Sequence, residues 1–385
     1  FLGRGFTSLL KIKLKELYEI PINIIYPIIG FFYISNITLL TNFFFKINSQ
    51  FSILLLIIPL FFNLFLLELK KLKISIKNLS LYIFTPLVLG ISSSNINLAY
   101  DAGLYHLNHQ KWLQTDKIIF GLSNNHNRFG YSSIIEYLNV NFWLNDNFIL
   151  LHFTNLIFMV VFFQIIYIFL FSKRFKFAIS ILIYGLLDNF GFNGGKNGFI
   201  EVESIAKQDT PFAIIFIIST YVLYELYLDK SVVAKEKLFI IFLLTIFSVE
   251  LRLLGFINVV FFLIILLYKY QFRKSLNIIF KDNFLISLFG ISFIVKNLIT
   301  SSCMFYPVKI TCFNFLPWST GNYSSPGAEN DALVDFHIAM TSENYSYWFR
   351  EWMTKEVNNT VFKNASITFL ILLFYLLFQR LKNNE

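Results

Sequence analysis

Charged residues are scarce in this chain of 385 residues: only 14% are Asp, Glu, Lys or Arg, whereas 56% are hydrophobic and 49 are phenylalanine. Its mean hydropathy of +0.62 lies outside the range of water-soluble domains. The composition therefore excludes a soluble globular protein and predicts a polytopic membrane protein.

Several sequence signatures are also missing. The chain has no repeat of solenoid period, no low-complexity linker, and no G-x-G-x-x-G or G-K-[ST] motif. It is therefore expected to form a single membrane domain over 1–385 without a cradle for nucleotide phosphates. Its two cysteines, Cys303 and Cys312, form no C-x-x-C pair of the zinc-binding type. The first residue is Phe1, and "FLGRGF" reads as the tail of an earlier apolar segment, so some N-terminal sequence is expected to be missing.

The net charge of +9 has a simple explanation in a membrane protein. A surplus of this size would suggest nucleic acid as the partner of a soluble protein. In membrane proteins, however, basic residues collect in the cytoplasmic loops. Membrane lipids are therefore the expected partners, and nucleic acid is not.

Apolar runs predict an all-α membrane protein with about ten transmembrane helices, since each crossing needs roughly 20 residues. The predicted spans lie at about 21–41, 51–69, 79–96, 148–171, 177–188, 211–229, 237–250, 253–269, 283–299 and 365–379. The run from Lys237 to Lys269 is too long for one span and carries Glu250 and Arg252 in its middle. We interpret it as a hairpin with its tip at "SVELRLLG". The alternative is one long buried helix, which would invert the topology of everything that follows.

Basic clusters set the predicted orientation. With the hairpin in place, "KIKLKEL", "KKLKISIK", "SKRFK", "DKSVVAKEK", "KYQFRK" and "QRLK" all fall on one side, which the positive-inside rule makes cytoplasmic. The loops at 97–147, 189–210, 250–252 and 297–364 are then extracytoplasmic, and the two long ones are expected to contain interfacial helices. Cys303 and Cys312 share the last loop, on the oxidising side, so they are predicted to form a disulfide worth about 2–3 kcal/mol.

The stretch "AYDAGLYHLNHQKW" at 99–112 places Asp101 just beyond a predicted span. Its carboxylate has two interpretations. It can cap the start of an interfacial helix, because side-chain oxygens accept from the free N–H groups there. It can also serve as a general base or metal ligand at the boundary between lipid and water, where a lipid-linked substrate presents its headgroup.

Three motifs resemble those of a family of bacterial multi-spanning membrane proteins that is associated with surface polysaccharides and is similar in architecture to GT-C glycosyltransferases. They are "DAGLYHLNHQKWL", "GLSNNHNRFGYSS" and "KNLITSSCMFYPVKITCF", in that order along the chain. In GT-C enzymes an acidic residue in the first outward loop is the catalytic base, and this resemblance assigns that role to Asp101. Many of those enzymes carry two acids there, whereas Tyr100 and Ala102 flank Asp101 here. No cofactor is therefore implied, and a divalent cation stays open.

Sugar transfer from a polyprenyl-phosphate carrier needs cations for the departing phosphate as well as a base. Arg128, Arg252 and Lys296 are the outward cations that can hold it. Arg252 has an alternative interpretation as the local partner of Glu250. His106 is also placed at the substrate. Together with His109 it has the spacing of a metal pair, but no third ligand is identifiable.

Two further groups are candidates for the acceptor or the sugar platform. Glu201 and Glu203 lie in "EVESIAKQD" and are either solvated charges or part of an acceptor site. Trp348 and Arg350 lie in "YWFREW", which suits stacking on sugar rings and equally suits anchoring at the interface.

These features predict an inverting GT-C-type glycosyltransferase in the bacterial inner membrane. It would act on the extracytoplasmic face, using a polyprenyl-phosphate-linked sugar and a glycan or lipid acceptor. A polymerase or ligase of O-antigen or capsule units is the nearest alternative. A transporter or flippase of lipid-linked glycans is the rival from another class, but it would place charges in the middle of the membrane.

Overall fold

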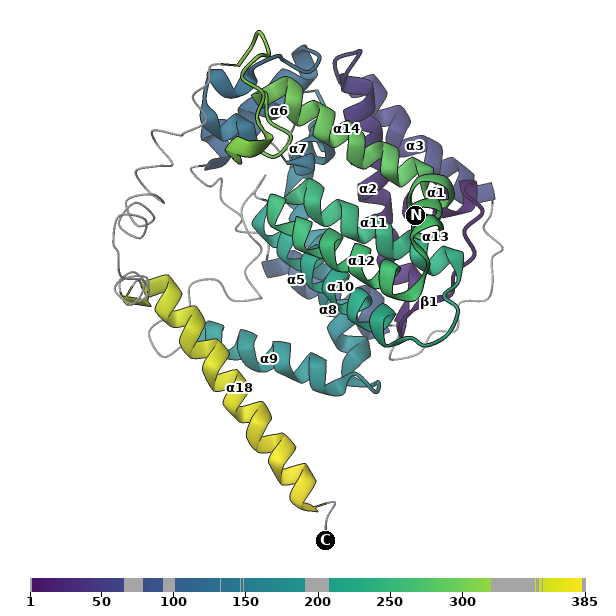
Figure 1. The fold of residues 1–385 in the computed structure, drawn as a ribbon, viewed down its shortest axis with the longest axis vertical. Coiled ribbons are helices and arrows are strands. Elements are labelled where there is room, and N and C mark those ends of the chain that lie inside the picture. The colour runs from purple at the N-terminus through teal and green to yellow at the C-terminus, as the bar shows by residue number, and fades with distance from the viewer. Residues whose placement is uncertain are drawn as a thin grey trace. The chain divides into compact units, whose positions relative to one another are not determined.

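The computed structural model describes residues 2–65, 79–92, 101–190, 208–319 and 350–382, apart from 132, 146, 148, 351, 352 and 355. The described chain is almost entirely helical (Figure 1), as the apolar composition predicts. One short antiparallel hairpin is formed by β1 (Glu16–Leu17) and β2 (Ile20–Pro21). The α-helices are α1 (Leu2–Leu9), α2 (Ile22–Asn42), α3 (Ser49–Phe65), α5 (Thr85–Ser92), α6 (Leu107–Thr115), α7 (Ile134–Asn139), α8 (His152–Leu170), α9 (Phe175–Phe190), α10 (Asp209–Leu228), α11 (Lys235–Leu251), α12 (Phe256–Lys269), α13 (Phe272–Asn277), α14 (Phe284–Ser301) and α18 (Glu356–Lys382).

The chain divides into two compact units. Unit 1 comprises 1–165 and 202–323, and unit 2 comprises 166–201 and 324–385. All the described side chains of the candidate site except Arg350 belong to unit 1. Unit 2 contains α9 and α18, which pack against each other.

The number of membrane-spanning helices is lower than the sequence predicts. Among the described residues, four helices are long and apolar enough to cross a bilayer: α2, α8, α10 and α14. Apolar segments at Ser49–Phe61, Ser80–Ile91, Phe175–Leu187 and Leu253–Lys269 are shorter. About ten spans is therefore an overcount. The physical reason is that a short apolar run also occurs in buried or interfacial helices, which hydropathy does not distinguish from a crossing.

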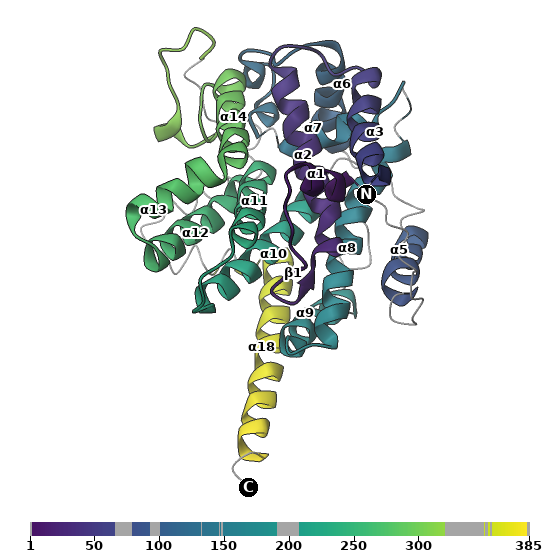
Figure 2. The ribbon, with the colours of Figure 1, turned by 90° about the vertical axis from the view of Figure 1, so that its right-hand side faces the viewer.

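Helix α2 is the centre of unit 1 (Figure 2), where it packs against α1, α7, α11 and α14. Its residues are apolar around most of the circumference, which is the pattern of a helix surrounded by others. Phe32 packs edge-on against Phe247 of α11 and Phe289 of α14, with ring centroids 5.6 and 5.7 Å apart. Phe31 contacts Phe158 of α8 at 5.4 Å. These rings fix α11 and α14 on α2, and both helices carry site residues near their C-terminal ends.

The predicted hairpin at 250–252 is confirmed. Helix α11 ends at Leu251, Arg252 is extended, a 3-10 turn covers Leu253–Gly255, and α12 begins at Phe256. The two helices then pack on each other, with Phe242 and Phe262 stacked at 5.2 Å. A Cβ built on Gly255 would lie 2.2 Å from the carbonyl oxygen of Ser248, so only glycine allows this close turn. The alternative of one continuous helix is wrong.

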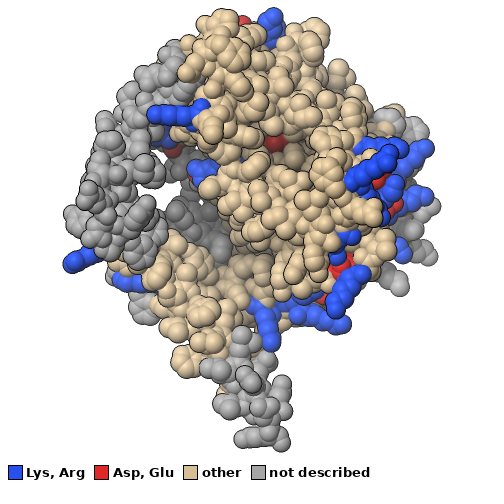
Figure 3. Space-filling view, viewed as in Figure 1, with Lys and Arg blue, Asp and Glu red and all other residues tan. Residues whose placement is uncertain are grey.

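Basic residues gather at one end of the unit 1 helices (Figure 3), along the edge formed by the β-hairpin, α12 and α13. There the Lys237 ammonium lies 4.8 Å from the centre of the Tyr18 ring, and Lys235 pairs with Asp282 at 3.3 Å. Helices α2, α10, α12 and α14 each have one terminus near this end. The other end of unit 1 carries Asp209, Arg252 and Lys296. It contains the opposite termini of α2, α10 and α14 and the C-terminus of α11. Unit 1 therefore has a basic end and a site end.

Labelling from each side of the membrane tests this polarity. We expect Val232→Cys, at a 90% exposed position of the basic end, to react with an impermeant maleimide only from the cytoplasm. His126→Cys, at an exposed position of the site end, should react only from outside. The native cysteines form a disulfide and give no background. Labelling of His126→Cys only from the cytoplasm would reverse the orientation.

Candidate functional site

The motif that contains Asp101 forms a helix at the site end of unit 1. A π-helical turn, η3 (Ala102–His106), continues into α6. Asp101 stands immediately before the turn, half-buried, and its side chain makes no hydrogen bond to the helix that follows. A capping role therefore has no support in the observed geometry. The opposite face of the helix is turned inward, since His106, His109 and Gln110 are all buried.

Glu136 of α7 is the centre of a buried polar cluster. Its side chain is fixed by two contacts from the Asp101 helix: Oε1 bonds to Nδ1 of His106, and Oε2 accepts a 2.8 Å hydrogen bond from Nε2 of Gln110. Only 2% of Glu136 is exposed. Ser133 begins α7 by accepting from the N–H of Ile135. Because of that cap, "SSIIEYL" has the pattern of an ordinary helix start, and nothing in the sequence singles out Glu136.

Lys296 of α14 is completely buried, at 0% exposure, close enough to Glu136 and Glu250 to interact with both charges. Glu250 of α11 is itself 1% exposed, and its Oε2 accepts a 2.9 Å hydrogen bond from Nδ2 of Asn36 in α2. We call His106, Gln110, Glu136, Glu250 and Lys296 the buried network. Four elements supply it, namely η3–α6, α7, α11 and α14. The buried network therefore connects these elements to one another at the site end of unit 1.

Arg252 does not pair with Glu250, so that alternative interpretation is wrong. Its Nη1 instead contacts Oδ1 of Asp209 at 2.6 Å, and the two side chains are 44% and 46% exposed. The physical reason is the break in the helix: Glu250 still belongs to α11 and turns inward, whereas Arg252 is extended and reaches the first residue of α10. An exposed pair of this kind contributes little to stability.

Tyr105 lies beside charged side chains at the surface of the site. The Arg128 guanidinium is 5.8 Å from the centre of the Tyr105 ring. The pKa of Tyr105 is raised to about 12, mainly by burial and next by the nearby charge of Asp101. Arg128 opposes this increase, and Glu136 and Asp209 add smaller increases. We call Asp101, Tyr105, Arg128, Asp209 and Arg252 the rim. The ring of Tyr105 lies 4.2 Å from that of His106, between centroids, so the rim borders the buried network.

His109 is buried beside the network and stays neutral near pH 7. Desolvation lowers its pKa to about 4, against an opposing effect from Glu136 and with smaller lowering effects from Lys296 and His106. An unfolded histidine takes up its proton near pH 6.5. As the pH falls from about 6.5 to 4, the unfolded chain therefore binds a proton that the folded chain excludes, and His109 lowers the stability of the fold.

The loop closed by the disulfide packs against the turn that carries Arg128. Cys303 and Cys312 are bonded, with an S–S distance of 2.01 Å, just after α14. The loop packs Tyr306 onto Gly130, where an added Cβ would lie 2.6 Å from the ring, and edge-on against Tyr131 at 5.1 Å. It therefore holds the 3-10 turn Asn127–Tyr131, which carries Arg128.

The structure does not assign a place at this site to four further predicted residues. Glu201, Glu203 and Trp348 lie outside the described residues, and Arg350 is exposed and belongs to unit 2. Within the described ranges, no group of three or more His, Cys, Asp or Glu side chains is placed to hold a metal ion.

Comparison with known proteins gives one match. A family model described as a domain of unknown function, DUF8201, matches residues 1–385. No curated protein and no solved structure matches the chain.

Proposed function

The chain belongs to the DUF8201 family, and we propose that it is a membrane glycosyltransferase of GT-C type that takes a sugar from a polyprenyl-phosphate carrier. The single observation that supports this most is the rim. Asp101 stands at the start of the η3–α6 helix, Arg128 lies in a 3-10 turn and Arg252 follows α11. The charges of Asp101, Arg128 and Asp209 nevertheless all act on Tyr105, and Arg252 pairs with Asp209. A carboxylate and two guanidinium groups at one surface are what this transfer requires.

In the proposed reaction, an acceptor hydroxyl attacks the anomeric carbon of the sugar while the bond from that carbon to the phosphate oxygen breaks. The hydroxyl proton passes to the Asp101 carboxylate, and the polyprenyl phosphate leaves with the electron pair. Inversion at the anomeric carbon follows from this single displacement. The acceptor is a glycan or a lipid of the cell envelope, and the reaction takes place on the extracytoplasmic face of the bacterial inner membrane.

Arg128 and Arg252 hold the phosphate in this proposal. A guanidinium has five N–H donors, so the contact of Arg252 with one oxygen of Asp209 leaves donors for a phosphate. The two arginines are also partly exposed, which an incoming lipid headgroup requires.

His106 and Lys296 take different roles from those that the sequence suggested. Both are buried, and His106 is bonded to Glu136, so neither is open to a phosphate. In the proposal they hold the Asp101 helix in place through Glu136, which is bonded to His106 and interacts with the charge of Lys296. The charges of the buried network lie near helix ends, since Glu250 is one residue from the end of α11 and Lys296 five from the end of α14. Charges near helix ends favour a transferase over a transporter, which would place charges in the middle of the membrane.

Transfer by the purified protein tests the proposal. The full chain in liposomes, given a polyprenyl-phosphate-linked radioactive sugar and envelope glycolipids, should release polyprenyl phosphate. Arg252→Gln should slow this release about 100-fold, because it removes donors that stabilise the departing phosphate. Arg273→Gln, at an exposed position of the basic end, is the matched control and should retain full activity.

Two results would contradict the proposal. Release of carrier only from pyrophosphate-linked oligosaccharides would indicate a polymerase or ligase instead. Movement of a lipid-linked glycan across the vesicle membrane with no bond broken would indicate a flippase.

A further inference from the structure

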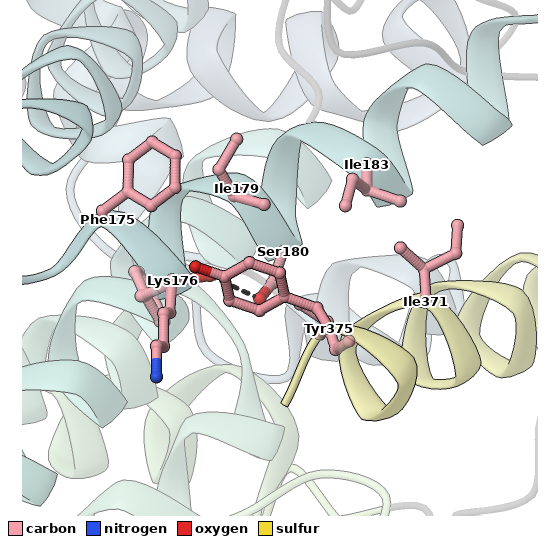
Figure 4. Close-up of a pocket in the computed structure, with 9 residues that line it drawn as sticks. Phe175, Lys176, Ile179, Ser180, Ile183, Ile371 and Tyr375 are labelled. Carbon is pink, nitrogen blue, oxygen red and sulfur yellow. Dashed lines mark hydrogen bonds between the residues drawn. The ribbon is translucent and has the colours of Figure 1, made fainter. Parts of the chain in front are cut away.

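A groove lined by residues of unit 2 shares no residue with the candidate site. It has a volume of about 410 Å³ and runs between α9 and α18. Figure 4 shows Phe175, Ile179 and Ile183 of α9 facing Ile371 and Tyr375 of α18. The volume is within the roughly 300–1,000 Å³ that is usual for ligand sites. The walls are hydrocarbon and aromatic, so they suit an apolar occupant.

One polar group on the groove wall, the hydroxyl of Ser180, is satisfied within α9. The hydroxyl of Ser180 donates to the backbone carbonyl oxygen of Lys176 at 2.6 Å, so it offers no polar floor to a ligand. Phe175, Ile371 and Tyr375 nevertheless remain 42%, 43% and 40% exposed. The groove is therefore an open apolar channel along the helix pair.

One end of the groove carries positive charge. The Lys176 ammonium lies 6.0 Å from the centre of the Tyr375 ring, and the exposed Lys173 precedes it in the same "SKRFK" cluster. Ile183 and Ile371 form the other end, which is apolar (Figure 4). An occupant that matches both ends has an anionic head and a hydrocarbon tail.

The length of the groove selects a lipid chain over a spanning helix. From Lys176 to Ile183 the groove follows α9 for about 10 Å, at about 1.5 Å per residue. One leaflet of the bilayer core is about 15 Å thick, whereas a partner helix would need the full 30 Å or so. The positive-inside rule assigns the "SKRFK" cluster to the cytoplasmic side.

We propose that the groove between α9 and α18 binds an acyl chain of an anionic phospholipid from the cytoplasmic leaflet, with its headgroup phosphate at Lys173 and Lys176. This site is independent of the rim and of the glycosyl transfer proposed there. It serves to anchor α18 to α9 through a lipid.

Native mass spectrometry of the delipidated full chain tests this site with two lipids that have the same tails, dioleoyl phosphatidylglycerol and dioleoyl phosphatidylcholine. The wild type should bind one phosphatidylglycerol in preference to phosphatidylcholine. Lys176→Gln should weaken phosphatidylglycerol binding about fivefold and leave phosphatidylcholine binding unchanged, because one lysine is lost from the headgroup site. Ile179→Trp fills the groove and should abolish binding of both lipids.

Matched controls are Lys281→Gln and Ile264→Trp, which change exposed positions of unit 1 and should bind as the wild type does. Equal binding of the two lipids by the wild type, or undiminished binding by Ile179→Trp, would overturn the proposal. So would displacement of the lipid by inorganic phosphate alone, or a dimer without lipid that Ile179→Trp dissociates.

If Ile179→Trp does not fold, a second experiment uses a phosphatidylglycerol with a diazirine in its acyl chain. Cross-links within 175–183 support the site, and their absence there contradicts it.

Discussion

Asp101→Asn is expected to reduce glycan transfer by about 100-fold or more and to leave the folded structure intact. The reason is that asparagine keeps the size of the side chain but cannot accept the proton of the acceptor hydroxyl. Asp101 is only half-buried and makes no hydrogen bond to the helix that it precedes, so little stability depends on its charge. Steady-state transfer by the reconstituted protein, with thermal unfolding measured in parallel, checks both parts.

Asp116→Asn is the matched control, because Asp116 is an exposed aspartate at the other end of the same helix. It should transfer sugar at the wild-type rate. Binding of the lipid carrier should also survive in Asp101→Asn, since the arginines remain. Full activity of Asp101→Asn would remove Asp101 as the base and would leave Asp209 as the other carboxylate of the rim.

Lys296→Met is expected to give the largest loss of stability, about 3–5 kcal/mol, because it leaves buried carboxylates without their cation. Lys296 is fully buried, and both Glu136 and Glu250 interact with its charge. Methionine fills a similar volume, so the loss reports the charge and not a cavity. Chemical unfolding in detergent, followed by circular dichroism, measures it.

A double variant separates charge from packing. Lys296→Met combined with Glu250→Gln should recover part of the lost stability, because one buried carboxylate is then neutral and still accepts from Asn36. Lys281→Met is the control, at an exposed lysine where substitution changes stability by less than about 0.5 kcal/mol. A Lys296→Met protein as stable as Lys281→Met would show that the buried network does not stabilise the fold.

Local patterns in the sequence predicted the features that depend on local chemistry. The hairpin at 250–252 followed from two charges inside one long apolar run, because a helix that carries them in mid-membrane is unfavourable. The pairing of Cys303 with Cys312 followed from their shared loop, and the structure contains that bond. The number of spans was overestimated, because hydropathy reports the composition of a segment and not the residues at which its helix begins and ends.

The sequence by itself determined that this protein is helical, apolar and basic at one set of loops, and it singled out Asp101, Arg128 and Arg252 by residue type. Only the tertiary structure decided that Arg252 pairs with Asp209, that His106 and Lys296 are buried, and that Glu136 holds the Asp101 helix. The reason is physical. Hydropathy is a property of neighbouring residues. The partner of a charge is set by how α7, the consecutive helices α10 and α11, and α14 pack, and these three parts lie far apart along the chain.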